Sequence, residues 1–206
     1  YVETQHKPFK PDVIKVVDIK NPNAPIFIIP IQIYRAPVVL VHGFTGGGEG
    51  ESFEITKNML LRTEKYKDEL IKVADYESSS FRGFKFNKGV VPKEIKEIFE
   101  NLRAQNYSCG KVDLVGFSMG GILSRIYLQS SDYIKKQDIN KLITINTPHS
   151  GSQWGNFVLS LDPAKLLFGE LIGFLNNILG MPLYKQFDAV IDLSVNSEEI
   201  INLNSY

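Results

Sequence analysis

The residue best placed for chemistry is Ser118, in the segment Gly116-Phe-Ser-Met-Gly120. A short apolar run at 112–115 precedes this segment, and a stretch with helical periodicity at 120–129 follows it. Such a strand–turn–helix arrangement presents a serine hydroxyl at a sharp bend, as a nucleophilic serine requires. Gly116 and Gly120 leave room for the bend, because they have no side chain to clash. The pattern predicts that Ser118 is a nucleophile, against the alternative of a serine that only caps a helix.

A second segment could hold the negative charge that develops on an attacked carbonyl. Residues 37–41 form a wholly apolar run, typical of a strand buried on both faces, and His42, Gly43 and Phe44 follow it. An oxyanion hole in such a fold uses the amide after the nucleophile and a second amide from the loop after an earlier strand. We therefore expect the amides of Met119 and Phe44 to form it. A plain flexible loop is the alternative, and His42 is expected to be a structural hydrogen-bonding residue rather than a base.

The elements that must position these residues alternate between strands and helices. Their predicted order is strand 37–41, helix 53–62, strand 70–76, helix 92–105, strand 112–115, helix 120–129 and strand 142–145. This alternation predicts βαβ units, and so an α/β fold with a mostly parallel central sheet and flanking helices. Two earlier apolar runs, 13–19 and 26–33, are punctuated by prolines and suit edge strands or extended connections.

Composition and charge exclude several classes of protein. The chain has 206 residues, 43% of them hydrophobic, and its 23 basic and 23 acidic residues leave no net charge. Disordered and fibrous proteins differ from this composition, and a nucleic-acid-binding protein would usually carry a basic excess. A single cysteine, Cys109, excludes an internal disulfide and a cysteine-based zinc site. The longest charge-free apolar stretch, 171–184, is too short to span a bilayer, so no transmembrane segment is expected.

A third segment, Asn-Thr-Pro-His-Ser-Gly-Ser at 146–152, follows the strand predicted at 142–145. Together with V-H-G-F-T-G-G at 41–47 and G-F-S-M-G-G at 116–121, it makes the chain resemble the α/β-hydrolase superfamily, and its lipase branch most closely. The resemblance implies Ser118 as the nucleophile and an oxyanion hole from the amides of Phe44 and Met119. The residues that it marks as supporting the motifs are His42, Gly43, Gly116, Gly120 and His149.

By this resemblance, the catalytic triad is incomplete in the chain. The family order is serine, acid, histidine, but the only histidine after Ser118 is His149, in a motif where the family does not place its base. Three interpretations stay open. The chain is a fragment whose missing C-terminal part carries the acid and the histidine, or it is a catalytically inactive relative, or His149 completes a non-standard dyad. Asp188 or Asp192 could be a displaced acid, although each suits a turn or a helix cap.

We expect one α/β-hydrolase-like domain over residues 1–206, truncated at its C-terminal end. Its parts are N-terminal strands at 1–35, a core with the nucleophile at 36–150, an apolar lid-like segment at 151–186 and a return segment at 187–206. The lid-like segment has one apolar helical face, made by Leu167, Leu171, Phe174, Leu175, Ile178 and Leu179. A core helix would show the same pattern, but lipases insert a lid here, and an apolar helix over the site would shield acyl chains and could dock on a lipid surface.

The sequence therefore predicts a serine hydrolase that cleaves lipid-like carboxylic esters through an acyl-enzyme on Ser118. Two alternatives remain: an acyltransferase on the same scaffold, in which an alcohol replaces water, and an inactive lipid-binding relative. The expected partners are a lipid or ester substrate and a lipid–water interface, without nucleic acid. The mechanism requires no metal and no organic cofactor. A secreted or cell-envelope location is favoured over a cytoplasmic one.

Overall fold

A computed structural model describes residues 12–21, 23, 25–31, 33–44, 53–153, 155–156 and 188–205 of the chain. By the contacts between its residues, the chain divides into two compact units, residues 1–35 and 36–206. None of the helices in the described ranges combines the length and the apolar character that crossing a membrane requires.

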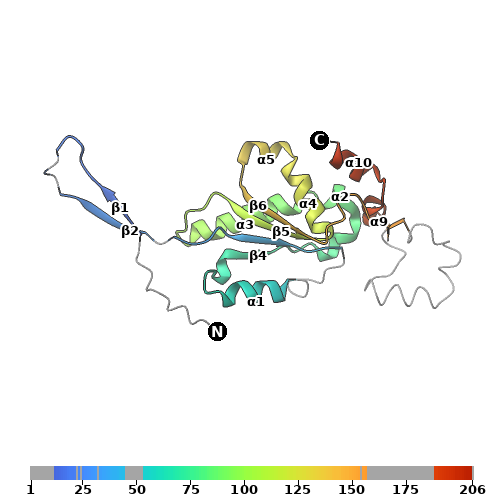
Figure 1. Cartoon of the computed structure of the whole chain (residues 1–206), viewed down its shortest axis with the longest axis horizontal. Helices are drawn as coiled ribbons and strands as arrows, with labels where there is room; N and C mark the ends of the chain where they lie inside the picture. Colours follow the sequence, from blue (N-terminus) through green and yellow to red (C-terminus); the bar gives the residue numbers. More distant parts are fainter. Residues whose placement is uncertain are drawn as a thin grey trace, which may run out of the picture. The chain divides into compact units, whose positions relative to one another are not determined.

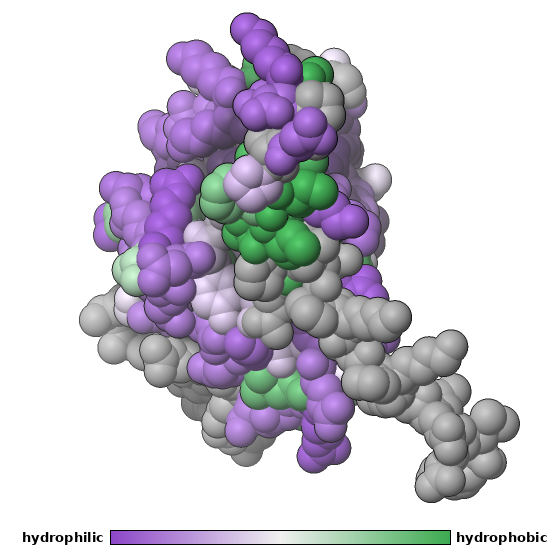
Figure 2. All heavy atoms as spheres, turned by 90° about the vertical axis from the view of Figure 1, so that its left-hand side faces the viewer, coloured by the Kyte–Doolittle hydropathy of each residue, from purple (hydrophilic) through white to green (hydrophobic). Residues whose placement is uncertain are grey.

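The N-terminal unit contains a β-hairpin of two antiparallel strands, β1 (Asp12–Val16) and β2 (Phe27–Ile31). Both strands are rich in β-branched residues, which favour the pleated conformation. Several hydrophobic side chains of the hairpin are exposed, among them Ile14, Val16, Phe27, Ile28 and Ile29. Figure 2 shows hydrophobic side chains gathered at the surface, with hydrophilic side chains on either side of them.

The second unit is built on a parallel four-stranded sheet in the order β4-β3-β5-β6 (Figure 1). Its strands are β3 (Val38–Val41), β4 (Ile71–Val73), β5 (Val112–Phe117) and β6 (Ile139–Ile145). The register sets Leu40 of β3 opposite Val73 and Val115. Because the strands are parallel, their carboxyl ends meet at one edge of the sheet, where the loops after β3 and β5 lie together. The predicted α/β fold with a mostly parallel sheet is confirmed.

Helices flank this sheet (Figure 1). The α-helices are α1 (Glu54–Arg62), α2 (Gly83–Asn87), α3 (Val90–Ala104), α4 (Met119–Leu128), α5 (Ser131–Lys136), α9 (Asp188–Leu193) and α10 (Glu198–Asn204), with 3-10 helices η1 (Asp68–Leu70) and η2 (Glu77–Arg82). The apolar residues of α3 that share one helical face, Ile95, Ile98, Phe99 and Leu102, are all buried, as their spacing predicts. The sequence does not predict α2, α5, α9 and α10, because helices of five to seven residues are too short to show a periodic pattern.

The core lies on both faces of β3, whose four residues are all buried. Val38 and Leu40 belong to a cluster with Phe53, which leads into α1, and with Leu60 and Leu61 of that helix. The alternate residues of the strand point to the opposite face, and α3 and α4 contact β3. A wholly apolar run therefore becomes a central strand covered on both sides, and the loop that begins at His42 follows it directly.

Strand β6 differs from the short buried strand predicted at 142–145. It is longer than predicted, and Ile143 and Ile145 are 50% and 39% exposed. Within the described residues β6 pairs only with β5, so it is an edge strand of the sheet. A short apolar run does not reveal whether its strand is central or at an edge, because that depends on the neighbours it finds in the fold.

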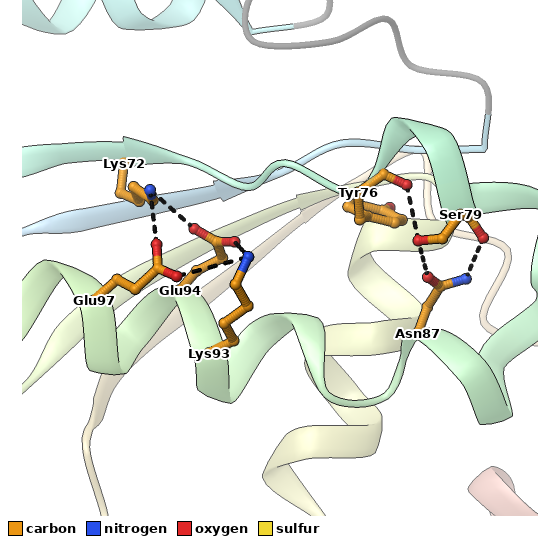
Figure 3. A network of polar contacts seen from close by, with 7 residues as sticks. All are labelled: Lys72, Tyr76, Ser79, Asn87, Lys93, Glu94 and Glu97. Carbon is orange, nitrogen blue, oxygen red and sulfur yellow. Dashed lines mark hydrogen bonds and ion pairs between the residues drawn. The ribbon is translucent and has the colours of Figure 1, made fainter.

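An ion-pair network fastens α3 to β4 (Figure 3). The Glu94 side chain is only 1% exposed, and Lys72 Nζ lies 3.3 Å from Glu94 Oε2 and 3.0 Å from Glu97 Oε2. Lys93 Nζ lies 3.4 Å from the other Glu94 oxygen. Although burial by itself lowers the pKa of Lys72, the Glu97 and Glu94 carboxylates raise it above its ordinary value. The buried carboxylate is tolerated because two cations neutralise it.

Candidate active site

Ser118 stands at the sharp turn between β5 and α4. Its backbone has φ 51° and ψ −122°, in a region of positive φ that a residue with a side chain rarely adopts. The Ser118 amide donates a hydrogen bond to the Ile145 carbonyl at 2.8 Å, and the Gly121 amide donates to the Ser118 carbonyl at 3.1 Å. The end of β6 and the first turn of α4 therefore hold the strained residue from two sides.

Two glycines make this turn possible. A Cβ atom on Gly116 would lie 2.5 Å from the Gly121 Cα atom, and a Cβ atom on Gly120 would lie 2.0 Å from the Val41 carbonyl oxygen. Both neighbours are backbone atoms, which cannot move aside unless a whole element shifts. Gly116 lets the strand and the helix of the turn approach each other. Gly120 does something that the sequence does not reveal: it lets the start of α4 rest on the end of β3.

The loop after β3 meets the turn at Gly43. A Cβ atom on Gly43 would lie 2.9 Å from the Ser118 Cβ atom, so the Gly43 backbone lies against the candidate nucleophile. Phe44 follows directly along the chain, and Met119 begins α4 with its side chain fully buried. The two amides that the sequence assigns to an oxyanion hole thus belong to the two segments that meet at Ser118. Their role in holding an oxyanion stays a prediction.

His42 is a buried residue at the end of β3, 1% exposed. Its Nδ1 lies 2.8 Å from the Gly43 carbonyl oxygen, and since a carbonyl can only accept, Nδ1 carries the proton. Burial lowers the pKa of His42, so its ring is neutral at pH 7. The ring also stacks on Tyr76, a residue to which the sequence gives no role. These are the contacts of a structural residue.

His149 is tied to neighbours other than Ser118. Its Nδ1 lies 3.3 Å from Arg125 Nη1, and its Nε2 lies 3.2 Å from Thr144 Oγ1. A guanidinium can only donate, so the lone pair of the ring sits on Nδ1 and faces Arg125, while Nε2–H donates to the threonine. Burial, and then the Arg125 charge, lower the pKa of His149. This geometry does not support a dyad in which His149 accepts the Ser118 proton.

Arg125 joins the nucleophile helix to the return segment. Its Nη2 donates to the Leu203 carbonyl at 3.2 Å and to Asn204 Oδ1 at 2.8 Å, and Asn204 Nδ2 donates to the His149 carbonyl at 2.9 Å. The segment around His149 also packs on the helix, because a Cβ atom on Gly121 would lie 2.0 Å from Thr147 Oγ1. No local sequence signal marks Arg125, since its partners are distant along the chain.

Of the two candidate displaced acids, Asp192 makes a structural hydrogen bond. Asp192 Oδ2 accepts a hydrogen bond from the Phe84 amide at 2.6 Å, in the first turn of α2. Burial raises the pKa of Asp192 to about 6, above its ordinary value of 3.8. Asp188, in the first turn of α9, is exposed. Asp192 thus binds an amide at the start of α2, far away along the chain, and this contact is not one that its sequence context predicts.

Part of the predicted site lies outside the described residues. The lid-like segment predicted at 151–186 is described only at residues 151–153 and 155–156. Within the described ranges, no group of three or more His, Cys, Asp or Glu residues is arranged to hold a metal ion. Because most of the lid-like segment lies outside the described residues, the lid stays a prediction.

Comparison with known proteins adds a family and a fold. A model of the palmitoyl protein thioesterase family matches residues 37–178. The mature lipase BlEst2 of Bacillus licheniformis is 23% identical, with a TM-score of 0.57, and the match covers 84% of this chain and 61% of that one. Phospholipase PlaB of Legionella pneumophila is 15% identical, with a TM-score of 0.58, over 82% of this chain and 34% of that one.

The chain thus spans less than two-thirds of the length of either solved structure. No curated protein matches it in sequence. The two structural likenesses show that the chain shares the fold of these two proteins.

Proposed function

Because the chain belongs to the palmitoyl protein thioesterase family, we propose that it hydrolyses acyl esters or thioesters through an acyl-enzyme on Ser118. The observation that carries the proposal is the left-handed turn at Ser118, with the Gly43 backbone packed against its side chain. A helix cap would not require this backbone, since the serine caps of α5 and α10 have negative φ. The strain is more economically explained by presentation of the hydroxyl.

The reaction would follow the two-step course of serine hydrolases. The Ser118 hydroxyl gives its proton to a base while Oγ bonds to the acyl carbon, and the carbonyl oxygen becomes an oxyanion held by the amides of Phe44 and Met119. The intermediate then collapses, the bond to the alcohol or thiol breaks, and this group leaves with the proton. Water attacks the acyl-enzyme in the same way and releases the carboxylic acid. No step requires a metal or an organic cofactor.

We propose that the base is neither His42 nor His149. The lone pair of His42 is on Nε2, which is buried and accepts no hydrogen bond from Ser118, and the lone pair of His149 faces Arg125. The sequence-based expectation of an acid and a histidine elsewhere in the protein is kept as part of the proposal. The alternatives, an acyltransferase and an inactive relative, are outcomes of the test below.

The proposed acyl group is long and lipid-like. The name of the family refers to thioesterases of palmitoyl proteins, and the two similar solved structures are a lipase and a phospholipase. Adding thioesters extends the sequence-based expectation of carboxylic esters, because the same oxyanion forms in both reactions. A lipid–water interface remains part of the proposal through the apolar segment predicted to form a lid.

The test uses the longest native form of the protein with a fluorophosphonate probe and two pairs of substrates, 4-nitrophenyl palmitate against acetate and palmitoyl against acetyl thioesters. We expect labelling and palmitoyl hydrolysis, both abolished in Ser118→Ala and both unchanged in Ser108→Ala, an exposed serine. Absence of labelling in the unaltered protein would favour the inactive relative. Transfer of the acyl group to an added alcohol in preference to water would favour the acyltransferase.

A further inference from the structure

Tyr76 contacts the loop that carries the Phe44 amide, from a different part of the chain. It follows β4 and is 3% exposed. Its ring stacks on the His42 ring, with 4.0 Å between centroids and 13° between planes, and its hydroxyl donates to the His42 carbonyl oxygen. The Tyr76 carbonyl is itself held by the Ser79 amide at 3.0 Å and the Ser79 hydroxyl at 3.2 Å (Figure 3).

The carbonyls of His42 and Gly43 both accept hydrogen bonds from side chains. The His42 carbonyl accepts from the Tyr76 hydroxyl, and the Gly43 carbonyl accepts from His42 Nδ1. In a planar trans peptide, the carbonyl and the next N–H point in opposite directions, and the described peptide bonds are trans. Fixing the Gly43 carbonyl consequently fixes the direction of the Phe44 N–H. Neither peptide plane can rotate unless one of these bonds breaks.

The donors of both bonds keep their protons at neutral pH. Burial raises the pKa of Tyr76 far above its ordinary range, so its hydroxyl remains a donor. Burial lowers the pKa of His42, so its ring stays neutral with the proton on Nδ1. Both hydrogen bonds to the loop are therefore kept at neutral pH, because neither Tyr76 nor His42 changes its charge there.

We propose that Tyr76 is a positioning residue for the oxyanion hole, which acts through His42 to hold the Phe44 amide in the direction that a developing oxyanion requires. This inference rests on the proposed function. Tyr76 touches neither the substrate nor the reacting atoms in this scheme. Its effect falls on the transition state, because the amide contributes most where the negative charge has formed.

The test compares Tyr76→Phe, which keeps the stacked ring and removes only the hydroxyl, with Tyr107→Phe. Tyr107 donates to Glu69 Oε1 at 2.9 Å, outside the oxyanion loop, and is the matched control. We expect Tyr76→Phe to lower kcat about tenfold with KM nearly unchanged. We also expect its affinity for a trifluoromethyl ketone, which binds as an oxyanion, to fall by the same factor. Tyr107→Phe is expected to match the unaltered enzyme in all three quantities.

A second variant separates positioning from general stability. His42→Phe keeps an aromatic ring and removes the donor to Gly43, so we expect a similar fall in kcat. Because the two bonds hold adjacent peptides of the same loop, both variants loosen the segment that carries the Phe44 amide, and the double variant should lose less than the product of the two single losses. If one single variant folds poorly, circular dichroism identifies it, and kcat and the ketone affinity of the other single variant still test the positioning role.

The outcomes distinguish the inference from the function on which it rests. An unaltered kcat and an unaltered ketone affinity in a folded Tyr76→Phe enzyme would overturn the positioning role and leave the hydrolase intact. Losses that multiply in the double variant would also overturn it, because they would mean two independent effects. An unaltered protein that neither hydrolyses nor reacts with the probe would overturn both.

Discussion

Replacing Gly120 by alanine tests the packing that places Ser118. The added Cβ atom would lie 2.0 Å from the Val41 carbonyl oxygen and 2.4 Å from that of His42, whereas an ordinary contact needs at least 3.4 Å. The start of α4 would have to move away from β3 by more than an ångström. Overpacking of this kind costs about 3 kcal/mol, and the better helix propensity of alanine returns somewhat less than about 1 kcal/mol. We expect a net loss of about 2 kcal/mol.

The assay is urea denaturation followed by tryptophan fluorescence or circular dichroism, together with the rate of labelling by a fluorophosphonate. In a chain of this size a loss of about 2 kcal/mol lowers Tm by roughly 4–8 °C. The labelling rate should fall more than the stability suggests, because moving α4 separates the Met119 amide from the Gly43 loop. Gly89→Ala is the matched control, since a Cβ atom there meets nothing within 4 Å.

A Gly120→Ala variant as stable and as reactive as Gly89→Ala would refute this reasoning. It would mean that α4 does not rest on the end of β3 as closely as the structure shows. The close approach of the two segments at Ser118 would then be in error, and the assignment of the oxyanion amides would lose its support.

Three further perturbations test other parts of the structure. Ser118→Gly should be about 1 kcal/mol more stable than Ser118→Ala in urea denaturation, because glycine adopts a φ of 51° without strain; equal stability would argue against a strained turn. The folded-state pKa of Asp192, about 6, lies above its ordinary 3.8. Ionisation of this carboxyl therefore lowers the free energy of unfolding; the loss is absent below about pH 4 and reaches its full size as pH rises through about 6. Asp192→Asn should therefore raise the free energy of unfolding by about 3 kcal/mol at pH 7 and by almost nothing at pH 4, and a gain equal at both pH values would contradict the assignment. Lys72→Met should cost about 2 kcal/mol, because Glu94 stays buried with one cation fewer; a Lys72→Met/Glu94→Gln double variant that recovers none of this loss would show that the pair is not coupled.

Local spacing was enough to predict the part of the site that is continuous in sequence. The turn at Ser118, the glycines beside it and the apolar strands before each loop all depend on neighbours within a few residues. Those neighbours determine hydrophobic periodicity and the steric cost of a bend. Alternation of strands and helices then implied the parallel sheet, since parallel strands need a crossover between them. In a parallel sheet, the loops after β3 and β5 must emerge at the same edge.

Contacts between distant residues were decided by the tertiary structure alone. The Tyr76 hydroxyl reaches the His42 carbonyl across 34 positions, and Asp192 reaches the Phe84 amide across 108. The ring of His149 is occupied because Arg125 lies beside it in the fold, which no motif records. A hydrogen bond requires only that a donor and an acceptor come close, and many polar residues could be such partners. The sequence therefore determined which residues could react, and the packing of elements determined which of them are held, charged or already engaged.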